Sequence, residues 1–344
     1  MTNKITILDV AKEAGVSKST VSLVINNSSA VKLETQYKVR DAINKLGYVP
    51  NFAARGLTTK RNHILGIIFL TSDLVHSPDE FTSVPETLLY DVNIGIDKTL
   101  RNTDYALLSE RFSTNEKSLP DLITSGRVDG VFIIGGLYQP DFIERLKSSG
   151  MPAVLIGREH KEIDSVSPDL TKVGFIAGKK LVHTGHKKIL FVNGPRSSNN
   201  SQKKLDGLQL ALKDVRTGVT AKTLYSGYSS LEAYQTISEI WTNGYRPDAI
   251  FGGSDGITAG ILQFALQKGI RIPEDISLIG YERSVISEHT AIPYTVIDSH
   301  KDIMGEIACN ALLNRIHKPN SSLVHMQLEP TLISRDSIID RCVN

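Results

Sequence analysis

The sequence predicts an α/β protein that consists of a small all-α helix-turn-helix head and a two-lobed body with parallel sheets. Two observations support this division. Residues 9–26 place small and apolar side chains at helical spacing, whereas short apolar runs alternate with helical patterns from Ile64 onward. Such alternation is typical of parallel sheets covered by helices. The length of 344 residues is sufficient for one small module and two lobes.

Small residues and helix caps predict the first two helices of the head, residues 1–49. Ala11 allows two helices to cross closely, and Gly15 supplies a left-handed turn between them. Ser17 is placed to cap the second helix, while Thr6 and Asp9 form a capping box for the first. The shared core is expected to contain Val10, Ala14, Val16, Val21 and Val24. This pattern leaves one face of the second helix free, as DNA-reading helix pairs require.

A third helix over residues 33–46 is expected to close the head, with Glu34 placed to pair with Lys38. Residues 47–50 then break the helical pattern, and residues 50–62 form a hinge and linker. A short helix over residues 51–57 would have barely two turns and contains a glycine. We therefore expect this hinge helix to become ordered only when a partner holds it.

The body, residues 63–340, is expected to contain two lobes: lobe 1 at about 63–160 and 292–318, and lobe 2 at about 161–291 and 319–340. The expected strands are 64–70, 105–108, 130–134, 153–156, 188–192, 249–251 and 277–279. The expected helices are 92–101, 140–148, 173–183, 201–212, 231–242 and 257–268. Ligands of open α/β sheets bind beyond the carboxyl ends of the strands, so the cleft between the lobes is the expected pocket.

Charge is unevenly distributed along the chain. Residues 1–61 hold 10 Lys and Arg against 4 Asp and Glu, and the rest holds 29 against 33. A basic head on a mildly acidic body is typical of a DNA-binding module joined to a domain with another task. The two cysteines fit a reducing cytoplasm, and the scattered histidines lack metal-ligand spacing. We expect no metal, no cofactor, no export and no membrane association.

Several motifs, in order along nearly the whole chain, resemble the lactose-repressor (LacI/GalR) family of bacterial transcription regulators. In the head and hinge they are residues 7–22, 46–51 and 54–57, and in the body 126–132, 185–190, 247–251, 272–277 and 279–281. The resemblance implies a homodimer whose body folds like a periplasmic sugar-binding protein. It also implies a palindromic double-stranded DNA operator, bound with an affinity that a small-molecule effector controls, the effector being a sugar or sugar derivative.

The resemblance places Lys18, Ser19 and Leu23 at base-reading positions of the second helix. Many relatives carry Arg where this chain has Leu23, and leucine offers an apolar contact, for example to a thymine methyl, in place of a bidentate contact to guanine. The alternative for Leu23 is a core residue of the helix pair. Further contacts to phosphates, or helix caps near the DNA, are expected from Thr6, Ser17, Thr20, Ser22, Asn26 and Tyr48.

The hinge is the second expected DNA contact. By the same resemblance, Asn51, Ala54 and Leu57 face DNA or the partner hinge, and Leu57 acts as an apolar wedge in the minor groove at the operator centre. The alternative for Leu57 is that it packs the linker onto the body.

Seven residues are expected to bind the effector by resemblance: Arg158, Gln202, Tyr228, Ser254 and Glu282, with Thr71 and Asp73 from lobe 1. Tyr228 would stack on a sugar ring, and Arg158 and Glu282 would bond its hydroxyls. Gln202, Gly157 and Glu282 depart from residues that relatives carry, so the ligand's identity is not inherited. The alternative is that these side chains are solvated or paired within the fold. Residues 72–91 form either a lid on the cleft or a surface insertion.

Two other classes of protein compete with a regulator. A sugar-binding protein of a transport system would share the body, but it needs a signal peptide and no head. A catalytic protein, such as a sugar kinase with a DNA-binding head, would need a phosphate-binding loop or a nucleophile elbow, and the glycines at 135–136 and 252–253 form neither. We expect no enzyme. Induction and corepression both stay open, and the absence of a C-terminal leucine heptad favours a dimer over a tetramer.

Overall fold

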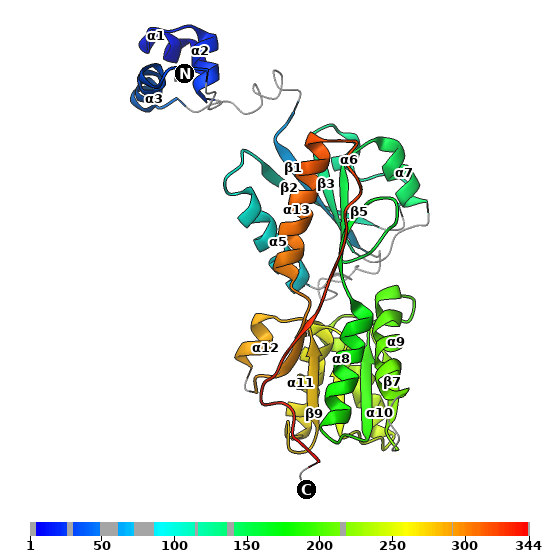
Figure 1. The fold of residues 1–344 in the computed structure, drawn as a ribbon. Helices are drawn as coiled ribbons and strands as arrows, with labels where there is room; N and C mark the ends of the chain where they lie inside the picture. The colour runs from blue at the N-terminus through cyan, green and yellow to red at the C-terminus, as the bar shows by residue number, and fades with distance from the viewer. Residues whose placement is uncertain are drawn as a thin grey trace. The chain divides into compact units, whose positions relative to one another are not determined.

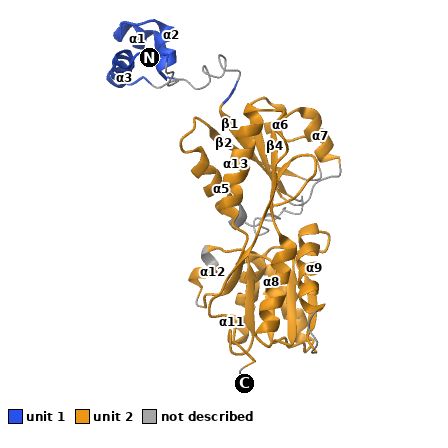
Figure 2. Cartoon of the chain, in the orientation of Figure 1, with its two compact units in different colours: residues 1–62 blue, residues 63–344 orange. Residues whose placement is uncertain are grey.

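In the computed structural model, the structure describes residues 5–25, 30–48, 61–71, 86–113, 116–135, 141–213, 218–290 and 292–342. The chain divides into two compact units, residues 1–62 and 63–344 (Figure 2). Within the described ranges, no helix has both the length and the apolar character needed to cross a membrane.

The head consists of α1 (Ile7–Glu13), α2 (Lys18–Ile25) and α3 (Leu33–Leu46). The predicted capping box of α1 is confirmed, since Asp9 Oδ2 accepts hydrogen bonds from the Thr6 backbone N–H at 2.8 Å and from its hydroxyl at 2.7 Å. The predicted cap of α2 is also confirmed, because Ser17 Oγ accepts from the Thr20 N–H at 3.1 Å. Gly15 supplies the turn with a φ of 65°.

The three helices bury one small apolar core. Val10, Val21 and Val24 are buried in it together with Val39 from α3, while Ala14, Val16 and Tyr48 pack partly buried against it. The expected pair between Glu34 and Lys38 is present at 2.8 Å on the outer surface. The core therefore uses one side of α2 and leaves the other side exposed.

The body contains two six-stranded sheets. The lobe 1 sheet is parallel throughout, in the order β11 (His325–Leu328), β5 (Asp164–Pro168), β4 (Ala153–Ile156), β3 (Gly130–Ile134), β1 (Ile64–Thr71) and β2 (Ala106–Ser113). The lobe 2 sheet runs β12 (Thr331–Ile333), β10 (Thr295–Asp298), β9 (Ser277–Tyr281), β8 (Ala249–Gly252), β6 (Lys188–Asn193) and β7 (Thr220–Tyr225), with β12 antiparallel. The predicted α/β class with parallel sheets is confirmed.

Helices cover both faces of each sheet (Figure 1). In lobe 1, α5 (Glu86–Leu100) and α13 (Lys301–His317) lie side by side on one face, and α6 (Asp121–Thr124) and α7 (Phe142–Ser149) pack on the other. The lobe 2 helices are α8 (Leu170–His183), α9 (Asn199–Lys213), α10 (Ser230–Thr242), α11 (Asp255–Lys268) and α12 (Val285–His289).

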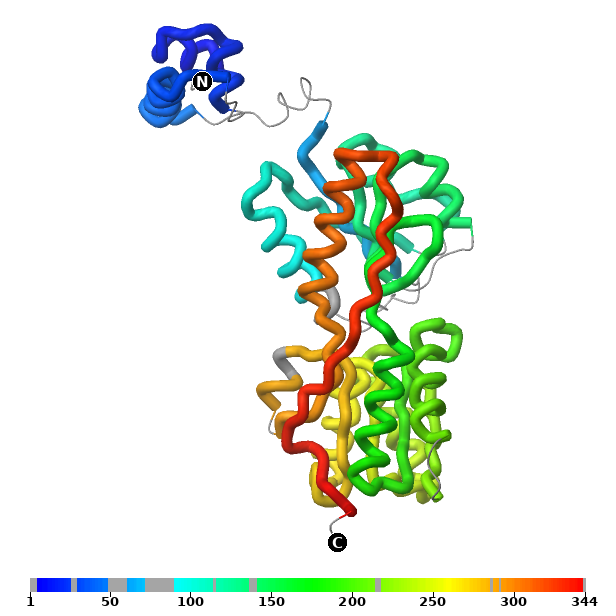
Figure 3. Tube along the Cα trace, in the orientation of Figure 1, coloured from blue at the N-terminus to red at the C-terminus, as the bar shows by residue number. Residues whose placement is uncertain are grey.

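The chain crosses between the lobes three times, as the tube in Figure 3 traces. The crossings lie between β5 and α8, between β10 and α13, and between β11 and β12. All three fall later than the lobe boundaries expected from the sequence, at 160/161, 291/292 and 318/319. The expectation was wrong here because β5 and β11, which lack a continuous apolar run, still belong to lobe 1, and β10 still belongs to lobe 2.

Candidate functional site

The exposed side of α2 carries the three side chains that the sequence assigned to base reading. Lys18 and Ser19 are exposed at the start of the helix, and 43% of Leu23 is exposed one turn further on. Leu23 therefore lies outside the core of the head, which is what a residue that contacts a ligand requires. Ser22 is half-buried beside it.

Hydroxyl groups gather at the start of α2. Ser17 Oγ lies 2.8 Å from Ser19 Oγ and 2.9 Å from Thr20 Oγ1. The first backbone N–H groups of a helix carry partial positive charge, so this end of α2 suits a phosphate group. Thr6 similarly begins α1, and Tyr48 lies half-buried against the core. Asn26, Asn51, Ala54 and Leu57 lie outside the described residues.

In the body, polar side chains gather where the lobe 2 strands β6, β8 and β9 end. The central group is Lys204 of α9, which is only 3% exposed. Its Nζ donates to the Gly253 carbonyl and lies 4.8 Å from the centre of the Tyr281 ring. Burial lowers the pKa of Lys204 to about 8, although the negative charges of Glu282 and Asp255 oppose that shift. A buried ammonium group is thus held at the edge where ligands of such sheets bind.

Glu282 follows β9 directly and is buried at the same end of the lobe 2 sheet as Lys204, whose ammonium group it influences. Its backbone has a φ of 79°, an uncommon conformation for a residue with a side chain. Ser299 Oγ lies 2.8 and 2.7 Å from its two carboxylate oxygens, and its single hydroxyl proton donates to this carboxylate. Burial raises the pKa of Glu282, and the positive charge of Lys301 partly counters that rise. The fold therefore orients this carboxylate at an electrostatic cost.

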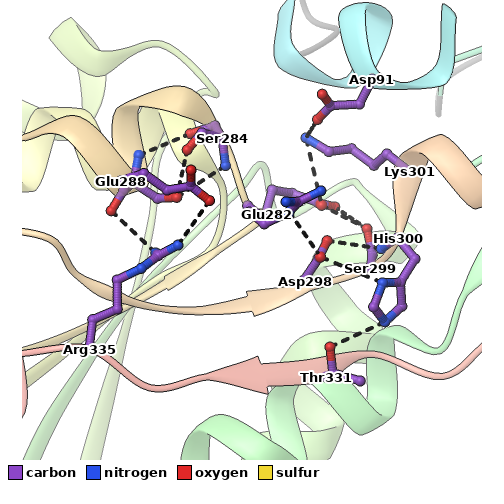
Figure 4. A network of polar contacts seen from close by, with 12 residues as sticks. Asp91, Glu282, Ser284, Glu288, Asp298, Ser299, His300, Lys301, Thr331 and Arg335 are labelled. Atoms are coloured by element: carbon purple, nitrogen blue, oxygen red, sulfur yellow. Dashed lines mark hydrogen bonds and ion pairs between the residues drawn. The ribbon is translucent and has the colours of Figure 1, made fainter. Parts of the chain in front are cut away.

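Lys301 stands between two carboxylates, as Figure 4 shows. Its Nζ lies 3.0 Å from Asp91 Oδ2 and 3.8 Å from Glu282 Oε2. Burial disfavours its ammonium form, but Glu282, Asp255 and Asp91 outweigh burial and raise the pKa of Lys301. Asp91 belongs to α5 in lobe 1, so this chain of charges joins the two lobes.

Hydroxyl groups line the neighbouring strand ends. Tyr228 Oη donates to Ser198 Oγ at 3.2 Å. Ser201 Oγ and Ser226 Oγ are buried and have no hydrogen-bond partner among the described residues. A side chain at Gly194 would meet the Tyr228 ring at 2.6 Å and Ser201 Oγ at 2.9 Å. Buried hydroxyl groups normally find partners, so this corner suits a ligand rich in hydrogen-bonding groups.

The structure brings only some of the predicted effector residues into this region. Glu282 and Tyr228 belong to it, and Ser254 is buried there as the cap of α11, accepting from the Ile257 N–H at 3.1 Å. Gln202 is exposed and donates to Asp206 at 2.7 Å along the outside of α9. Arg158 is half-buried after β4. Thr71 Oγ1 donates to the Phe112 carbonyl at 3.3 Å in lobe 1, and Asp73 lies outside the described residues.

Sequence reasoning missed five polar residues of the region: Asp91, Lys204, Asp255, Ser299 and Lys301. Lys204 had a detectable signal, because it lies three residues after Ser201 and four before Leu208, both fully buried. That spacing places it on the inner face of α9, whereas Gln202 faces outward. Among the described residues, no group of three His, Cys, Asp or Glu side chains could hold a metal ion.

Comparison with known proteins gives two family matches. Residues 6–51 match the model described as bacterial regulatory proteins, lacI family, and residues 179–338 match the periplasmic binding protein-like domain. The HTH-type transcriptional repressor PurR of Mannheimia succiniciproducens is 30% identical over 337 residues, covering 97% of this chain and 98% of the relative. PurR of Klebsiella pneumoniae (strain 342) is 30% identical over 343 residues, covering 97% of each chain.

Solved structures agree with these matches. The lac repressor dimer bound to operator and the anti-inducer ONPF aligns with a TM-score of 0.77 at 23% identity, covering 98% of this chain and 100% of its own. The complex of the transcriptional regulator CelR with cellobiose aligns with a TM-score of 0.69 at 25% identity, covering 97% and 99%. The predicted helix-turn-helix head and periplasmic-binding-protein-like body are confirmed, and the chain belongs to the lacI family of DNA-binding bacterial transcription regulators.

Proposed function

We propose that the protein is a homodimeric repressor that binds a palindromic operator and changes its operator affinity when a small carbohydrate occupies the cleft between its lobes. The observation that carries the DNA-binding part is the exposed side of α2, where Lys18, Ser19 and Leu23 stand clear of the head core. The match of residues 6–51 to the lacI family argues against a transport protein without DNA function.

Leu23 is the residue by which we expect the operator sequence of this protein to differ from operators read by an arginine at the same position. A leucine at a base-reading position makes apolar contact with a thymine methyl, whereas an arginine would bond the O6 and N7 atoms of guanine. Lys18 and Ser19 supply polar contacts, and Ser17, Thr20, Ser22 and Thr6 surround them with groups that position the helix on phosphates. Asn26, Tyr48, Asn51 and Ala54 complete the DNA-binding set that we propose.

The proposed effector site combines a positively charged hydrogen-bond donor, a negatively charged acceptor and an aromatic ring. The Lys204 ammonium donates, the Glu282 carboxylate accepts, and the Tyr228 ring offers an apolar face. Vicinal hydroxyl groups of a sugar satisfy such a mixed set, and the unpartnered Ser201 and Ser226 hydroxyls add further contacts. Two similar structures contain sugars, cellobiose in the CelR complex and ribose in a LacI family regulator from Enterococcus faecium. Arg158, Ser254, Thr71 and Asp73 are the other candidates for this site, whereas Gln202 faces away from it on the outside of α9.

In vitro selection of random duplex DNA on the full-length protein tests the proposed function. We expect a palindromic site with a flexible central step, and we expect its enrichment to change when ribose or cellobiose is added. A site without palindromic symmetry would contradict the dimeric operator. No enriched site, with or without the sugars, would contradict the DNA-reading role itself.

The proposed dimer interface lies on α5 and β2 of lobe 1. Tyr90, Ile94 and Leu108 are large apolar side chains that are exposed there. A groove there is lined by Asn93 of α5, Leu108 of β2 and Phe69 of the neighbouring strand β1. Apolar side chains gathered on an exposed face are typical of a protein–protein contact.

Ile94→Asp is expected to weaken dimerisation at least tenfold, because it would bury a carboxylate without a partner in the interface. Sedimentation equilibrium measures the association constant. Asp97→Ala, on the same helix and paired with exposed Arg101 at 3.3 Å, is the matched control and should leave the constant within twofold. An unchanged constant for Ile94→Asp would move the interface elsewhere.

Leu57→Ala is expected to lower the affinity for the selected duplex at least tenfold while leaving sugar binding unchanged. The physical reason is that the smaller side chain cannot unstack the central step of the duplex. Fluorescence anisotropy with labelled duplex gives the affinity, and Thr58→Ala serves as a neighbouring control. Equal affinity for Leu57→Ala and wild type would remove the wedge from the proposal.

A further inference from the structure

Helices α5 and α13 of lobe 1 are joined at backbone contact. A side chain at Gly95 of α5 would come within 1.9 Å of the Asp302 carbonyl oxygen, and one at Gly305 of α13 within 2.2 Å of the Val92 carbonyl oxygen. Lys98 and Glu306 form an ion pair across the same helices. Helices that approach so closely cannot slide independently, so α5 and α13 behave as one rigid element.

Lys301 is the first residue of this rigid element along α13 and lies at the second crossing between the lobes. Only 2% of Lys301 is exposed. Its ammonium group contacts Asp91 within the element and also faces Glu282 at the end of β9 in lobe 2. One buried cation therefore serves two carboxylates, one in each lobe.

The residue before Lys301 fixes the crossing itself (Figure 4). His300 has a φ of 58°, and its N–H donates to Asp298 Oδ1 at 3.0 Å. Its Nε2 is hydrogen bonded to Thr331 Oγ1 at 3.2 Å, which ties the second crossing to the third. These bonds define where α13 begins and hold the backbone from which Lys301 extends.

We propose that Lys301 is a positioning residue that couples the effector cleft to α5. This inference rests on the proposed effector role of Glu282. A hydroxyl group bound by Glu282 competes with Lys301 for the same carboxylate, and the resulting shift of Lys301 is passed to Asp91. Because α5 carries exposed Tyr90 and Ile94 on its outer face, the shift reaches the surface that we assign to the dimer.

Several features of the site favour such a role over a purely structural one. The distances to the two carboxylates are unequal, 3.0 Å to Asp91 and 3.8 Å to Glu282, so the cation is paired more closely with its lobe 1 partner than with the carboxylate of lobe 2. Ser299 independently holds Glu282 through both of its oxygens. Glu282 therefore keeps its place when Lys301 moves, and the movement is transmitted to lobe 1.

The experiment compares Lys301→Met with Lys98→Met in the full-length protein. Both changes remove a lysine that pairs across α5 and α13, but only Lys301 also faces lobe 2. Spin labels on Glu144→Cys of α7 and Gln209→Cys of α9, in a Cys342→Ser background, report the distance between the lobes by pulsed electron paramagnetic resonance. We expect Lys301→Met to shift the distance distribution or at least double its width, and Lys98→Met to preserve it.

Asp91→Asn supplies a second variant if Lys301→Met does not fold, and it should give the same change of distribution. Distributions like that of wild type in all folded variants would overturn the proposal. A second measurement uses the duplex that wild type selects: Lys301→Met should change its affinity at least fivefold, and Lys98→Met less than twofold. An affinity for the Lys301 variant equal to that of wild type would also overturn the coupling. The spin-label measurement of the distance between the lobes requires neither DNA nor sugar. Its outcome can therefore be distinguished from a failure of the proposed function.

Discussion

Lys204→Met is expected to stabilise the protein at pH 7 by about 1 to 3 kcal/mol. Burial holds the pKa of Lys204 at about 8, compared with 10.5 for a solvated lysine. The difference between these two pKa values corresponds to about 3 kcal/mol. Methionine has a similar length and no charge to bury, while the lost hydrogen bond to Gly253 and the contact with the Tyr281 ring offset part of the gain.

The same shift predicts a pH dependence with a definite sign. Between about pH 8 and pH 10.5 the unfolded chain binds a proton at Lys204 that the folded chain has released. The free energy of unfolding of wild type therefore rises with pH across this window, and the variant lacks this contribution. Urea unfolding at pH 7, 8, 9 and 10 measures the difference.

Lys203→Met is the matched control for Lys204→Met. Lys203 is the next residue along α9, but its side chain is nearer the surface and pairs with Glu159 at 3.0 Å. Its replacement should change stability by less than about 1 kcal/mol and should leave the pH slope as in wild type. A Lys204→Met variant with the slope of wild type would show that the ammonium group is not buried as described. Under the proposed function, the stabilised variant also loses its response to the effector, as is common when a binding group is removed.

Asp164→Ala is expected to lower the free energy of unfolding by about 3 to 5 kcal/mol. Asp164 begins β5 and is only 2% exposed. Its two oxygens accept from Arg315 Nε at 2.9 Å and from Arg315 Nη2 at 3.0 Å, and Oδ1 also accepts from the Val324 N–H at 2.7 Å. The alanine variant would leave the guanidinium group enclosed without its carboxylate.

Arg315 also donates to the carbonyls of Pro319 and Ser322 in the segment before β11. The lost stability should therefore come from the surroundings of Arg315 and from this segment. Urea unfolding measures the change, and Asp141→Ala is the control. Asp141 pairs with Arg145 at 3.3 Å in an exposed position, so its loss should cost less than about 1 kcal/mol. A cost below 1 kcal/mol for Asp164→Ala would show that Arg315 is solvated.

The sequence predicted the elements that have a clear apolar pattern and missed those that do not. Helix α13 was missed because its buried residues surround the helix axis: Lys301, Met304, Gly305, Ala308, Cys309, Ala311, Leu312 and Ile316. A helix enclosed on several sides has no single apolar stripe. Strand β5, with the sequence Asp-Ser-Val-Ser-Pro, was missed because polar residues rarely fill a fully buried strand.

The site was predictable to a similar extent. Exposure of Leu23 followed from the spacing of its apolar neighbours, Val21 and Val24, which define the inner side of α2. In the body, resemblance led to Gln202, although the helical spacing of α9 directs this side chain outward, as the fold shows. The partners of Glu282 come from residues 91, 299 and 301, which are distant in the chain or belong to an unpredicted helix. Such long-range groupings depend on topology, which local patterns do not encode.

The three crossings also determine the order in which the ribosome can build the molecule. The head is complete once α3 has emerged, but lobe 1 still lacks α13 and β11 when all of β1 to β5 has been made. Most of lobe 2 is synthesised between the two parts of lobe 1, and residues 325–328 then add the edge strand of the lobe 1 sheet. A truncated chain that ends before α13 would therefore expose the apolar face of lobe 1 to aggregation, and neither lobe can be produced from one uninterrupted gene fragment.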